Sequence, residues 1–496
     1  MKTPPLTLLH GALFAAPLWL AGCALTPPPD RVEAATPSGW QAPLPAKSTA
    51  LDNASDLPHH GTLTDLSQWW QQQNDPLLVE LIDTAQAVSP TVADALSRIA
   101  QSRASSVSAD AALLPKLDAS LTSSRSNTQE PLPLSTITQA QLQPSWEVDL
   151  FGGNRASSRA ALSRLQGAQA GWHDARVSVA AEVANRYYSL RTCNKLLAVS
   201  QSDADSRAET SRLSDLSAKA GFQAPATAAL ARASAAEASG RVTQQRTSCD
   251  LDVKALVALT GIDEPTLRTK MATSTQSPTA PIAIDSLPAQ TLLQRPDVFI
   301  AEREVAAASA EVGSAQAARY PRLSLSGSIG VARYHAAGTS TDLRTWSVGP
   351  IALSLPIFDG GERAANVDAA QARYESAVVA YRGKVRQAVR EVEEALVNLQ
   401  STASRSDDAR VAVEGYRASF EGTESLYRNG LASLLDLEDA RRLRLASELN
   451  AVSLERERMA AWIALYRAAG GGWRNPDAER MASSLSPAAQ QNSESK

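Results

Sequence analysis

The sequence is poor in the side chains from which catalytic and metal sites are most often built. It has three cysteines and five histidines in 496 residues. His59 and His60 are adjacent, the other histidines are far apart, and none has the spacing of a metal site. No phosphate-binding loop and no nucleophile elbow is present. We therefore expect no catalytic residue, no metal and no cofactor.

An excess of charge of one sign is also missing. There are 48 Lys and Arg against 52 Asp and Glu, a net charge of −4. Basic residues do not alternate with aromatic residues along any segment, so nucleic-acid binding is not expected. After residue 22, no apolar run is long enough to cross a membrane as a helix. Any membrane span must therefore be made of strands.

The first 22 residues resemble the signal peptide of a bacterial lipoprotein. Lys2 precedes a mostly apolar run, Leu6 to Leu20, which is too short for a stable transmembrane helix and ends in LAGC. The resemblance implies cleavage before Cys23 and acylation of its thiol, which anchors the chain in lipid. Position 24 is alanine. In the lipoproteins of Gram-negative bacteria, a residue other than aspartate after the acylated cysteine implies the outer membrane. Residues 23–75, rich in Pro, Ala, Ser and Thr, are expected to form an extended lipid-anchored lead.

The rest of the chain repeats itself once. Four landmarks recur at nearly constant offsets of 206 to 209 residues: Pro115 and Pro321, Gly152 and Gly360, Gly221 and Gly430, Gly261 and Gly470. A constant offset indicates a duplicated unit, with the order helix, strand, strand, long helix, turn, helix. We expect the first repeat at 76–261, an inter-repeat linker in the equatorial region at 262–288, the second repeat at 289–470 and a C-terminal tail at 471–496.

Alternation of apolar and polar residues predicts two β-hairpins, at about 116–150 and 322–357. From Leu323 to Val331 the odd positions are mainly apolar, while serine and glycine occupy the even positions. The runs are about ten residues long, the length of a tilted transmembrane strand. Alternation alone fits an amphipathic sheet in a soluble sandwich equally well. At Pro350 the apolar parity shifts, which predicts a bulge or bend in the last strand.

Two proline-free stretches, 153–219 and 361–430, predict unusually long helices. Each would measure about 100 Å at 1.5 Å per residue, too long for a compact domain. Apolar residues in the second stretch step by four and three, as in coiled coils: Val385, Val389, Val392, Leu396 and Leu399. Each long helix would turn back into a shorter one, giving coiled-coil hairpins at about 153–260 and 361–469. Helices are also expected before the strands, at about 76–114 and 290–319.

These features resemble the TolC-like outer-membrane factor family, in its lipoprotein branch. The resemblance covers the mature chain, most specifically in QRPDVFIAEREVAAASAEVGSAQAARYPRLSLSGSIG (294–330), SWEVDLFGG, LPIFDGGER and YRNGLASLLDLEDARR (427–442). It implies a mixed α and β fold in which a homotrimer forms a 12-stranded transmembrane β-barrel continuous with a periplasmic α-helical coiled-coil barrel. It also implies two protein partners, a periplasmic adaptor (membrane fusion) protein and an inner-membrane pump. Physical reasoning agrees with an oligomer, because four strands leave two open edges that lipid does not tolerate.

The implied function is that of the outer-membrane exit duct of a tripartite efflux system, which passively conducts drugs or other small molecules. The alternative within the channel class is the outer-membrane channel of a type I protein secretion system. A lipid-anchored coiled-coil scaffold without a pore is a third possibility, although the alternating strands speak against it. With four methionines in the chain, a methionine-lined copper or silver route is not supported.

Glycines mark the first candidate sites. Gly152-Gly153 and Gly360-Gly361 are expected to permit the sharp turns from barrel strand to helix. By resemblance, the turns at Gly221-Phe222 and Gly430-Leu431 are periplasmic tips that receive the adaptor. The alternative for these tips is simple helix capping.

Charged and polar residues near the tips are gate candidates, because family members close the duct there through ion pairs and hydrogen bonds. The six candidates are Glu424, Tyr427, Arg428 and Asp436, with Arg212 and Asp215 on the first hairpin. The alternative for each is a solvated surface side chain.

Cys193 and Cys249 are predicted to form a disulfide. If the first long helix turns back at Gly221, residues level with each other on the two arms have numbers that average about 221, and these two do. The periplasm is oxidising, so a level pair would be joined if its Cβ vectors converge. The alternative is two buried thiols that face apart. The second repeat has no such pair.

Overall fold

The computed structural model describes residues 25–37, 39–43, 69–72, 74–127, 134–274, 292 and 295–473. The chain divides into two compact units. The sheet unit comprises the residues up to Ala34, Ser97–Gln169 and Ile300–Gly383. The hairpin unit comprises Ala35–Leu96, Ala170–Phe299 and the residues from Lys384 onward. The lipidation candidate Cys23 lies outside the described residues.

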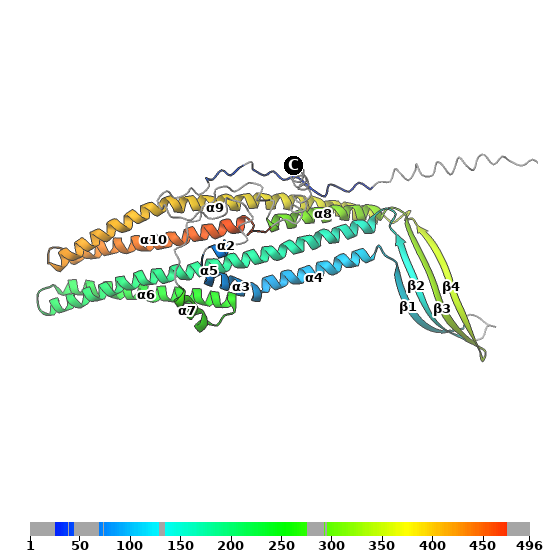
Figure 1. The fold of residues 1–496 in the computed structure, drawn as a ribbon, viewed down its shortest axis with the longest axis horizontal. Helices are drawn as coiled ribbons and strands as arrows, with labels where there is room; N and C mark the ends of the chain where they lie inside the picture. The colour runs from blue at the N-terminus through cyan, green and yellow to red at the C-terminus, as the bar shows by residue number, and fades with distance from the viewer. Residues whose placement is uncertain are drawn as a thin grey trace, which may run out of the picture. The chain divides into compact units, whose positions relative to one another are not determined.

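The sheet unit contains one antiparallel sheet of four strands in the order β1-β2-β3-β4. The strands fall in the two segments where alternation predicts them, and Figure 1 shows them side by side. They are β1 (Lys116–Ser126), β2 (Ser135–Val148), β3 (Arg322–Ala336) and β4 (Thr339–Ser354). The β3–β4 register shifts between Leu325 and Gly327, opposite Pro350. This shift confirms the predicted irregularity of the last strand.

Two helices of 67 residues, α5 (Gly153–Lys219) and α9 (Glu362–Arg428), occupy the proline-free stretches. Each is about 100 Å long. A helix of about half that length follows each, α6 (Pro225–Thr260) and α10 (Leu434–Ala468). In Figure 1, α5 with α6 and α9 with α10 form two helical hairpins. With α8 (Pro296–Ala317) before β3, the predicted order of elements occurs twice along the chain.

The helix expected at about 76–114 is interrupted. It consists of α3 (Pro76–Val88) and α4 (Pro90–Ala111). Ser89 between them is extended, with φ −66° and ψ 123°. The cause is Pro90, because a proline ring disfavours the helical conformation of the residue before it.

Short helices also occur in segments expected to be irregular. The linker at 262–288 contains α7 (Glu264–Thr273), whose first turn is capped by the Asp263 carboxylate. The lead at 23–75 contains α2 (Trp69–Gln72). The Trp69 ring packs on Tyr466 of α10, with the ring centroids 5.7 Å apart. Burial of aromatic surface thus fixes a segment whose average composition predicts no structure.

Coiled-coil packing forms the core of the hairpin unit. Of the predicted heptad residues of α9, all except Val389 are buried, and Ala388 is buried beside it. On α5 the buried face includes Val183, Tyr187 and Leu190. Removal of these side chains from water is the main stabilising contribution here. Among the described helices, none has an apolar stretch long enough to cross a membrane.

Candidate functional sites

The sheet carries its apolar side chains on one face. Residues paired across neighbouring strands share a face, and one row runs from Leu142 through Ile329 to Trp346. The exposed apolar residues of this face include Leu117, Leu121, Leu142, Ile329, Val331, Trp346, Val348, Ile351 and Leu353. Trp346 is 76% exposed and Val348 90%. An uncovered apolar surface of this kind marks a contact with another protein or with lipid.

The opposite face of the sheet is polar. It carries mainly hydroxyl and amide side chains: Ser120, Gln141, Gln143, Ser145, Ser324, Ser326, Ser328, Thr345 and Ser347. Ser328 and Ser347 share a hydrogen bond of 2.8 Å. Within the described residues, β1 and β4 each have a strand neighbour on one side and an open edge on the other. One apolar and one polar face are what a sheet between lipid and water requires.

An acidic side chain stabilises each turn from strand to helix. Asp149 accepts hydrogen bonds from the backbone and the guanidinium of Arg155, at 2.9 and 3.1 Å. Asp359 accepts the same pair from Arg363, at 3.3 and 2.8 Å, and Arg363 holds the pKa of Asp359 below its usual range. Both carboxylates thus occupy the positively polarised starts of the long helices. These acidic caps were not identified in the sequence analysis.

The four glycines expected at these turns have two different roles. Gly152, Gly360 and Gly361 have positive φ, of 76°, 63° and 94°, a conformation that other residues adopt only with strain. Gly153 does not. A Cβ there would lie 3.0 Å from the Ala317 Cβ, so this glycine allows α5 to pack closely on α8.

The two hairpin turns have the same structure. Gly221 and Gly430 have φ of 78° and 72°. The amide of the next residue, Phe222 or Leu431, donates back to a carbonyl of the long helix, at 2.9 and 2.8 Å. These bonds are those of a glycine-capped helix end. Phe222 is 86% exposed and Leu431 74%, so each turn presents an uncovered apolar side chain.

The six gate candidates make contacts near their own turns. On the first hairpin, Arg212 pairs with Glu209 at 2.7 Å and Asp215 with Arg232 at 3.1 Å. On the second, Arg428 pairs with Glu424 at 3.2 Å. Asp436 completes the capping box of α10 with Ser433. Tyr427 packs on an apolar cluster of Ala231, Phe420, Leu434 and Leu437. Among the described residues, no hydrogen bond or ion pair joins two candidates from different hairpins.

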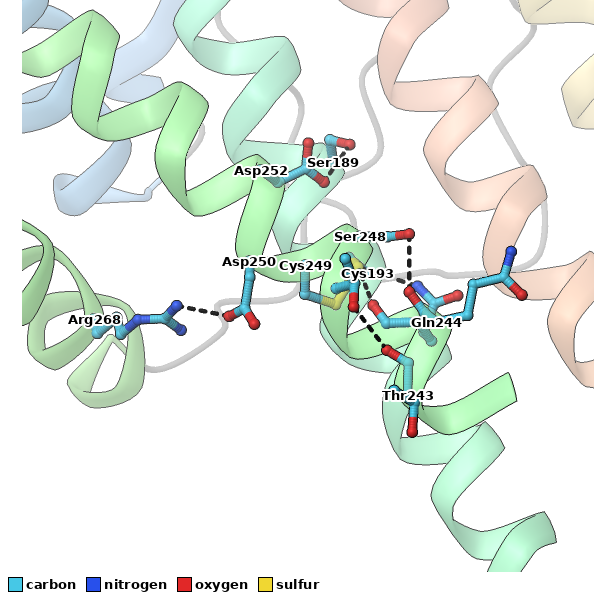
Figure 2. The surroundings of a disulfide bond; sticks show 11 residues. Ser189, Cys193, Thr243, Gln244, Ser248, Cys249, Asp250, Asp252 and Arg268 are labelled. Atoms are coloured by element: carbon cyan, nitrogen blue, oxygen red, sulfur yellow. Dashed lines mark hydrogen bonds and ion pairs between the residues drawn. A yellow bond between two sulfur atoms is a disulfide. The ribbon is translucent and has the colours of Figure 1, made fainter. Parts of the chain in front are cut away.

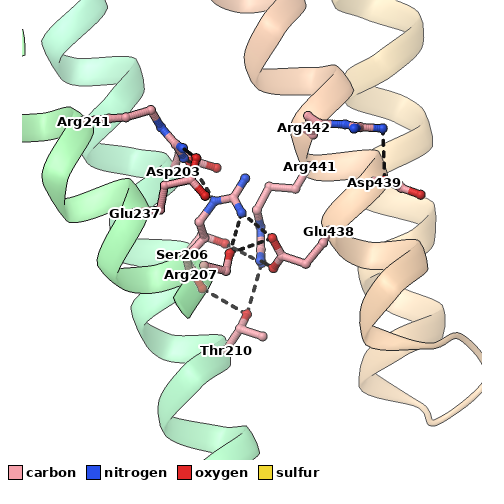
Figure 3. Close-up of polar contacts among 11 residues, drawn as sticks. Asp203, Ser206, Arg207, Thr210, Glu237, Arg241, Glu438, Asp439, Arg441 and Arg442 are labelled. Carbon is pink, nitrogen blue, oxygen red and sulfur yellow. Dashed lines mark hydrogen bonds and ion pairs between the residues drawn. The ribbon is translucent and has the colours of Figure 1, made fainter. Parts of the chain in front are cut away.

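A buried ion network links the two hairpins (Figure 3). Glu438 of α10 accepts a hydrogen bond from Arg441 at 2.7 Å and one from Ser234 of α6 at 2.8 Å. It also pairs with Arg207 of α5, whose Nε donates to Asp203 at 2.8 Å. Three helices are therefore joined around one carboxylate.

Arg441 lies at the centre of this network. It is 1% exposed, and it donates to the hydroxyls of Ser206 and Thr210 on α5, at 3.0 and 3.1 Å. Burial lowers the pKa of Arg441 below its usual value, although the Glu438 carboxylate acts in the opposite direction. Sequence reasoning missed the network, since Arg441 lies three residues from Glu438, a spacing typical of exposed ion pairs on one helix.

Cys193 and Cys249 are joined in a disulfide between α5 and α6, as the sequence predicts (Figure 2). The Cα atoms are 5.4 Å apart, within the usual range for disulfides. Both cysteines are buried. The Gln245 amide donates to the Cys193 sulfur at 3.0 Å.

The described histidines are held in local contacts. His173 on α5 lies against the Trp172 ring, with centroids 4.8 Å apart, and burial lowers its pKa. His335 on β3 has its Nδ1 2.9 Å from the Ser340 hydroxyl. Within the described ranges, no group of three or more His, Cys, Asp or Glu is placed to hold a metal ion.

A sheet with one exposed apolar face, together with two long helical hairpins in a duplicated chain, defines the class of the TolC-like outer-membrane channels. A family model described as outer membrane efflux protein matches residues 81–262 and 287–471. The chain belongs to the outer membrane efflux protein family. It is thus an efflux channel of the Gram-negative outer membrane, and the mixed α and β fold class expected from the sequence is confirmed.

Individual relatives match along nearly the whole chain. The pyoverdine export outer membrane protein OpmQ of Pseudomonas aeruginosa is 30% identical, covering 94% of this chain and 97% of that protein. The toluene efflux pump outer membrane protein TtgI of Pseudomonas putida is 29% identical, covering 92% and 97%. Among solved structures, the outer-membrane channel OprN has a TM-score of 0.75 at 26% identity, covering 90% of this chain and 99% of that one.

Proposed function

We propose that three copies of the chain form the outer-membrane exit duct of a tripartite efflux system. Each copy contributes its four strands to one 12-stranded barrel, and the long helices form a periplasmic tunnel. The observation that carries the proposal is the two-faced sheet with open edges at β1 and β4. In lipid, an open edge leaves backbone groups without partners, and each such group costs several kcal/mol. Pairing β4 of one copy with β1 of the next removes both edges.

The proposed partners are a periplasmic adaptor protein, which contacts the hairpin tips, and an inner-membrane pump. The exposed Phe222 and Leu431 offer the tips an apolar contact in each repeat. We propose small molecules as cargo, because OpmQ and TtgI are named for pyoverdine export and toluene efflux. These names favour efflux over type I protein secretion and over a scaffold without a pore.

The duct acts passively, without catalysis or a cofactor, and Cys23 carries the lipid that anchors the lead. Within the sheet unit the lead lies against two helices. The Pro28 carbonyl accepts a hydrogen bond from Ser309 of α8, and the Pro29 carbonyl accepts one from Tyr374 of α9 at 3.0 Å.

Mass spectrometry of the N-terminal peptide tests the anchor. An acylated Cys23 is expected, and an unmodified N-terminus starting at Met1 would contradict it.

Cross-linking of the sheet edges tests the assembly. Ser120 on β1 and Thr345 on β4 both lie on the polar face. The double variant Ser120→Cys with Thr345→Cys, treated with a flexible bismaleimide, should give a covalent ladder that ends at three chains. The matched control is each single variant, which should give no trimer. A double variant that stays monomeric, or a ladder that extends past three, would contradict the proposal.

A further inference from the structure

Basic side chains gather at one end of the apolar sheet face. The three successive rows of this face that lead to the β3–β4 turn contain Arg344, then Arg333, then Arg125 and His335. The single acidic residue of this face in the described strands is Asp342. An excess of positive charge therefore begins where the apolar rows end.

The opposite face has no such collection. Its positions at the same end of the sheet are uncharged, among them Ser124, Gln139, Tyr334 and Thr341. Solvent exposure of this end of the strands therefore does not explain the basic residues. They are confined to the face that carries the exposed leucine, isoleucine and valine side chains.

Two of these arginines have no charged partner among the described residues. Arg333 forms two hydrogen bonds with the Asp342 carboxylate, at 2.7 and 3.0 Å. Arg125 and Arg344 are exposed, and neither makes a hydrogen bond or ion pair with any described residue. A guanidinium has five N–H donors. Both arginines can therefore bind an external anion without first breaking an internal contact.

An apolar hollow lies directly beside the basic rows. It is an open depression of about 860 Å³ on the sheet surface. On this face it is lined by two positions from each strand: Ala119, Leu121, Ala140, Leu142, Ile329, Val331, Arg344 and Trp346. Arg344 belongs to the lining, so an unpaired guanidinium lies at the margin of an apolar depression.

We propose that this surface binds the phosphorylated, multiply acylated glycolipid of the outer leaflet. The acyl chains occupy the hollow, and phosphate oxygens accept hydrogen bonds from Arg344 and Arg125. The inference rests on the proposed function, in which the apolar face contacts lipid. Because α5 and α9 begin at the opposite ends of the strands and form the periplasmic tunnel, the β3–β4 turn lies on the outer side of the membrane. Phosphate suits a guanidinium because its oxygens can accept two parallel N–H donors. Trp346, in the row next to the basic ones, suits a membrane interface.

Lipid binding by the purified protein in detergent tests the proposal. The probes are bisphosphorylated lipid A, its dephosphorylated form, phosphatidylethanolamine and inorganic phosphate, with bound lipid counted by native mass spectrometry. The variant is Arg125→Gln with Arg344→Gln. The control is Arg322→Gln, because Arg322 also lacks a partner among the described residues but lies on the polar face at the other end of β3. Wild type and control should bind lipid A alike, and the double variant about tenfold more weakly.

The wild-type protein alone supplies a second measurement. Dephosphorylated lipid A and phosphatidylethanolamine should each bind about tenfold more weakly than bisphosphorylated lipid A. Equal binding of these lipids, or equal binding by the double variant and the wild type, would overturn the proposal. Binding of inorganic phosphate as tight as that of lipid A would replace it with a simple anion site. Single-channel conductance of the wild type tests the proposed function separately. Loss of lipid A binding should not affect conductance, so the double variant should conduct like the wild type.

Discussion

At the scale of single residues, a substitution at a hairpin tip should impair docking of a partner without preventing folding. At Gly221 and Gly430, a Cβ would meet no atom within 4 Å. A larger residue would therefore be penalised mainly by the left-handed backbone, at about 1–2 kcal/mol. The cost is small for a chain held by two coiled-coil hairpins, so folding should survive a substitution that blocks close approach of a partner.

Gly221→Trp and Gly430→Trp are each expected to abolish drug efflux while trimer formation and outer-membrane targeting remain normal. The measurement is drug resistance of cells that depend on this channel, with trimer content from a gel. Gly240→Trp and Gly415→Trp are matched controls, because both glycines are exposed in helices and a Cβ there would meet no atom within 4 Å outside its own helix backbone. Unchanged resistance in the two tip variants would show that the tips do not dock the adaptor.

The buried network should contribute more to stability than any surface pair. Glu438→Gln removes the carboxylate that Arg207 and Arg441 share. Loss of one partner from a buried pair typically costs about 3–5 kcal/mol. The control is Glu457→Gln, since the Arg405–Glu457 pair of 2.7 Å is half-exposed and should contribute less than about 1 kcal/mol. Hydrogen exchange of α10 should accelerate strongly in the first variant only, and equal acceleration in both would refute the assignment.

Gating belongs to the residue scale as well. If one of the six candidates holds the resting tip shut, removal of its charge or hydroxyl should raise single-channel conductance, because loss of an ion pair or hydrogen bond loosens the closed tip. The variants are Arg212→Gln, Asp215→Asn, Glu424→Gln, Tyr427→Phe, Arg428→Gln and Asp436→Asn. If all six conduct like the wild type, the gate lies elsewhere. Asp436→Asn should also destabilise the start of α10, because the Asp436 carboxylate completes its capping box.

At the scale of elements, the disulfide distinguishes the two hairpins. It joins α5 to α6 across 56 residues, whereas α9 and α10 contain no cysteine. A cross-link of this kind stabilises a fold by about 2–4 kcal/mol. In Cys193→Ser with Cys249→Ser, hydrogen exchange should therefore accelerate in α5 and α6 and stay unchanged in α9 and α10. A non-reduced digest of the wild type should contain the cross-linked peptide. Alkylation of both cysteines without reductant in denaturant would contradict it.

Regular elements could be predicted from the sequence where their signal is local. The ends of α5 follow from Gly153 and from the proline-free run, and the strands follow from alternation. The break at Pro90 was missed because helical spacing continues across it, although the proline itself was visible. The network around Arg441 could not be predicted. The packing of the two hairpins decides which charged residues become buried. The spacing of residues within one helix does not predict that packing.

At the scale of the whole molecule, one chain contains two copies of the same structural unit, which consists of a strand pair and a helical hairpin. Duplication explains why the acidic caps Asp149 and Asp359 and the tip glycines recur. The sheet still has open edges, so the repeat alone does not complete a membrane structure. Closure by three chains is the central claim, and it requires the polar face of the sheet to line water.

Planar-bilayer conductance of cysteine variants tests this claim most directly. Ser347 and Val348 are adjacent on β4 but belong to the polar and the apolar face. In Ser347→Cys, a bulky water-soluble thiol reagent should reduce single-channel conductance in three steps, one for each chain. In Val348→Cys, the same reagent should leave conductance unchanged. Block in Val348→Cys without block in Ser347→Cys, or no conductance from the unmodified protein, would contradict the account.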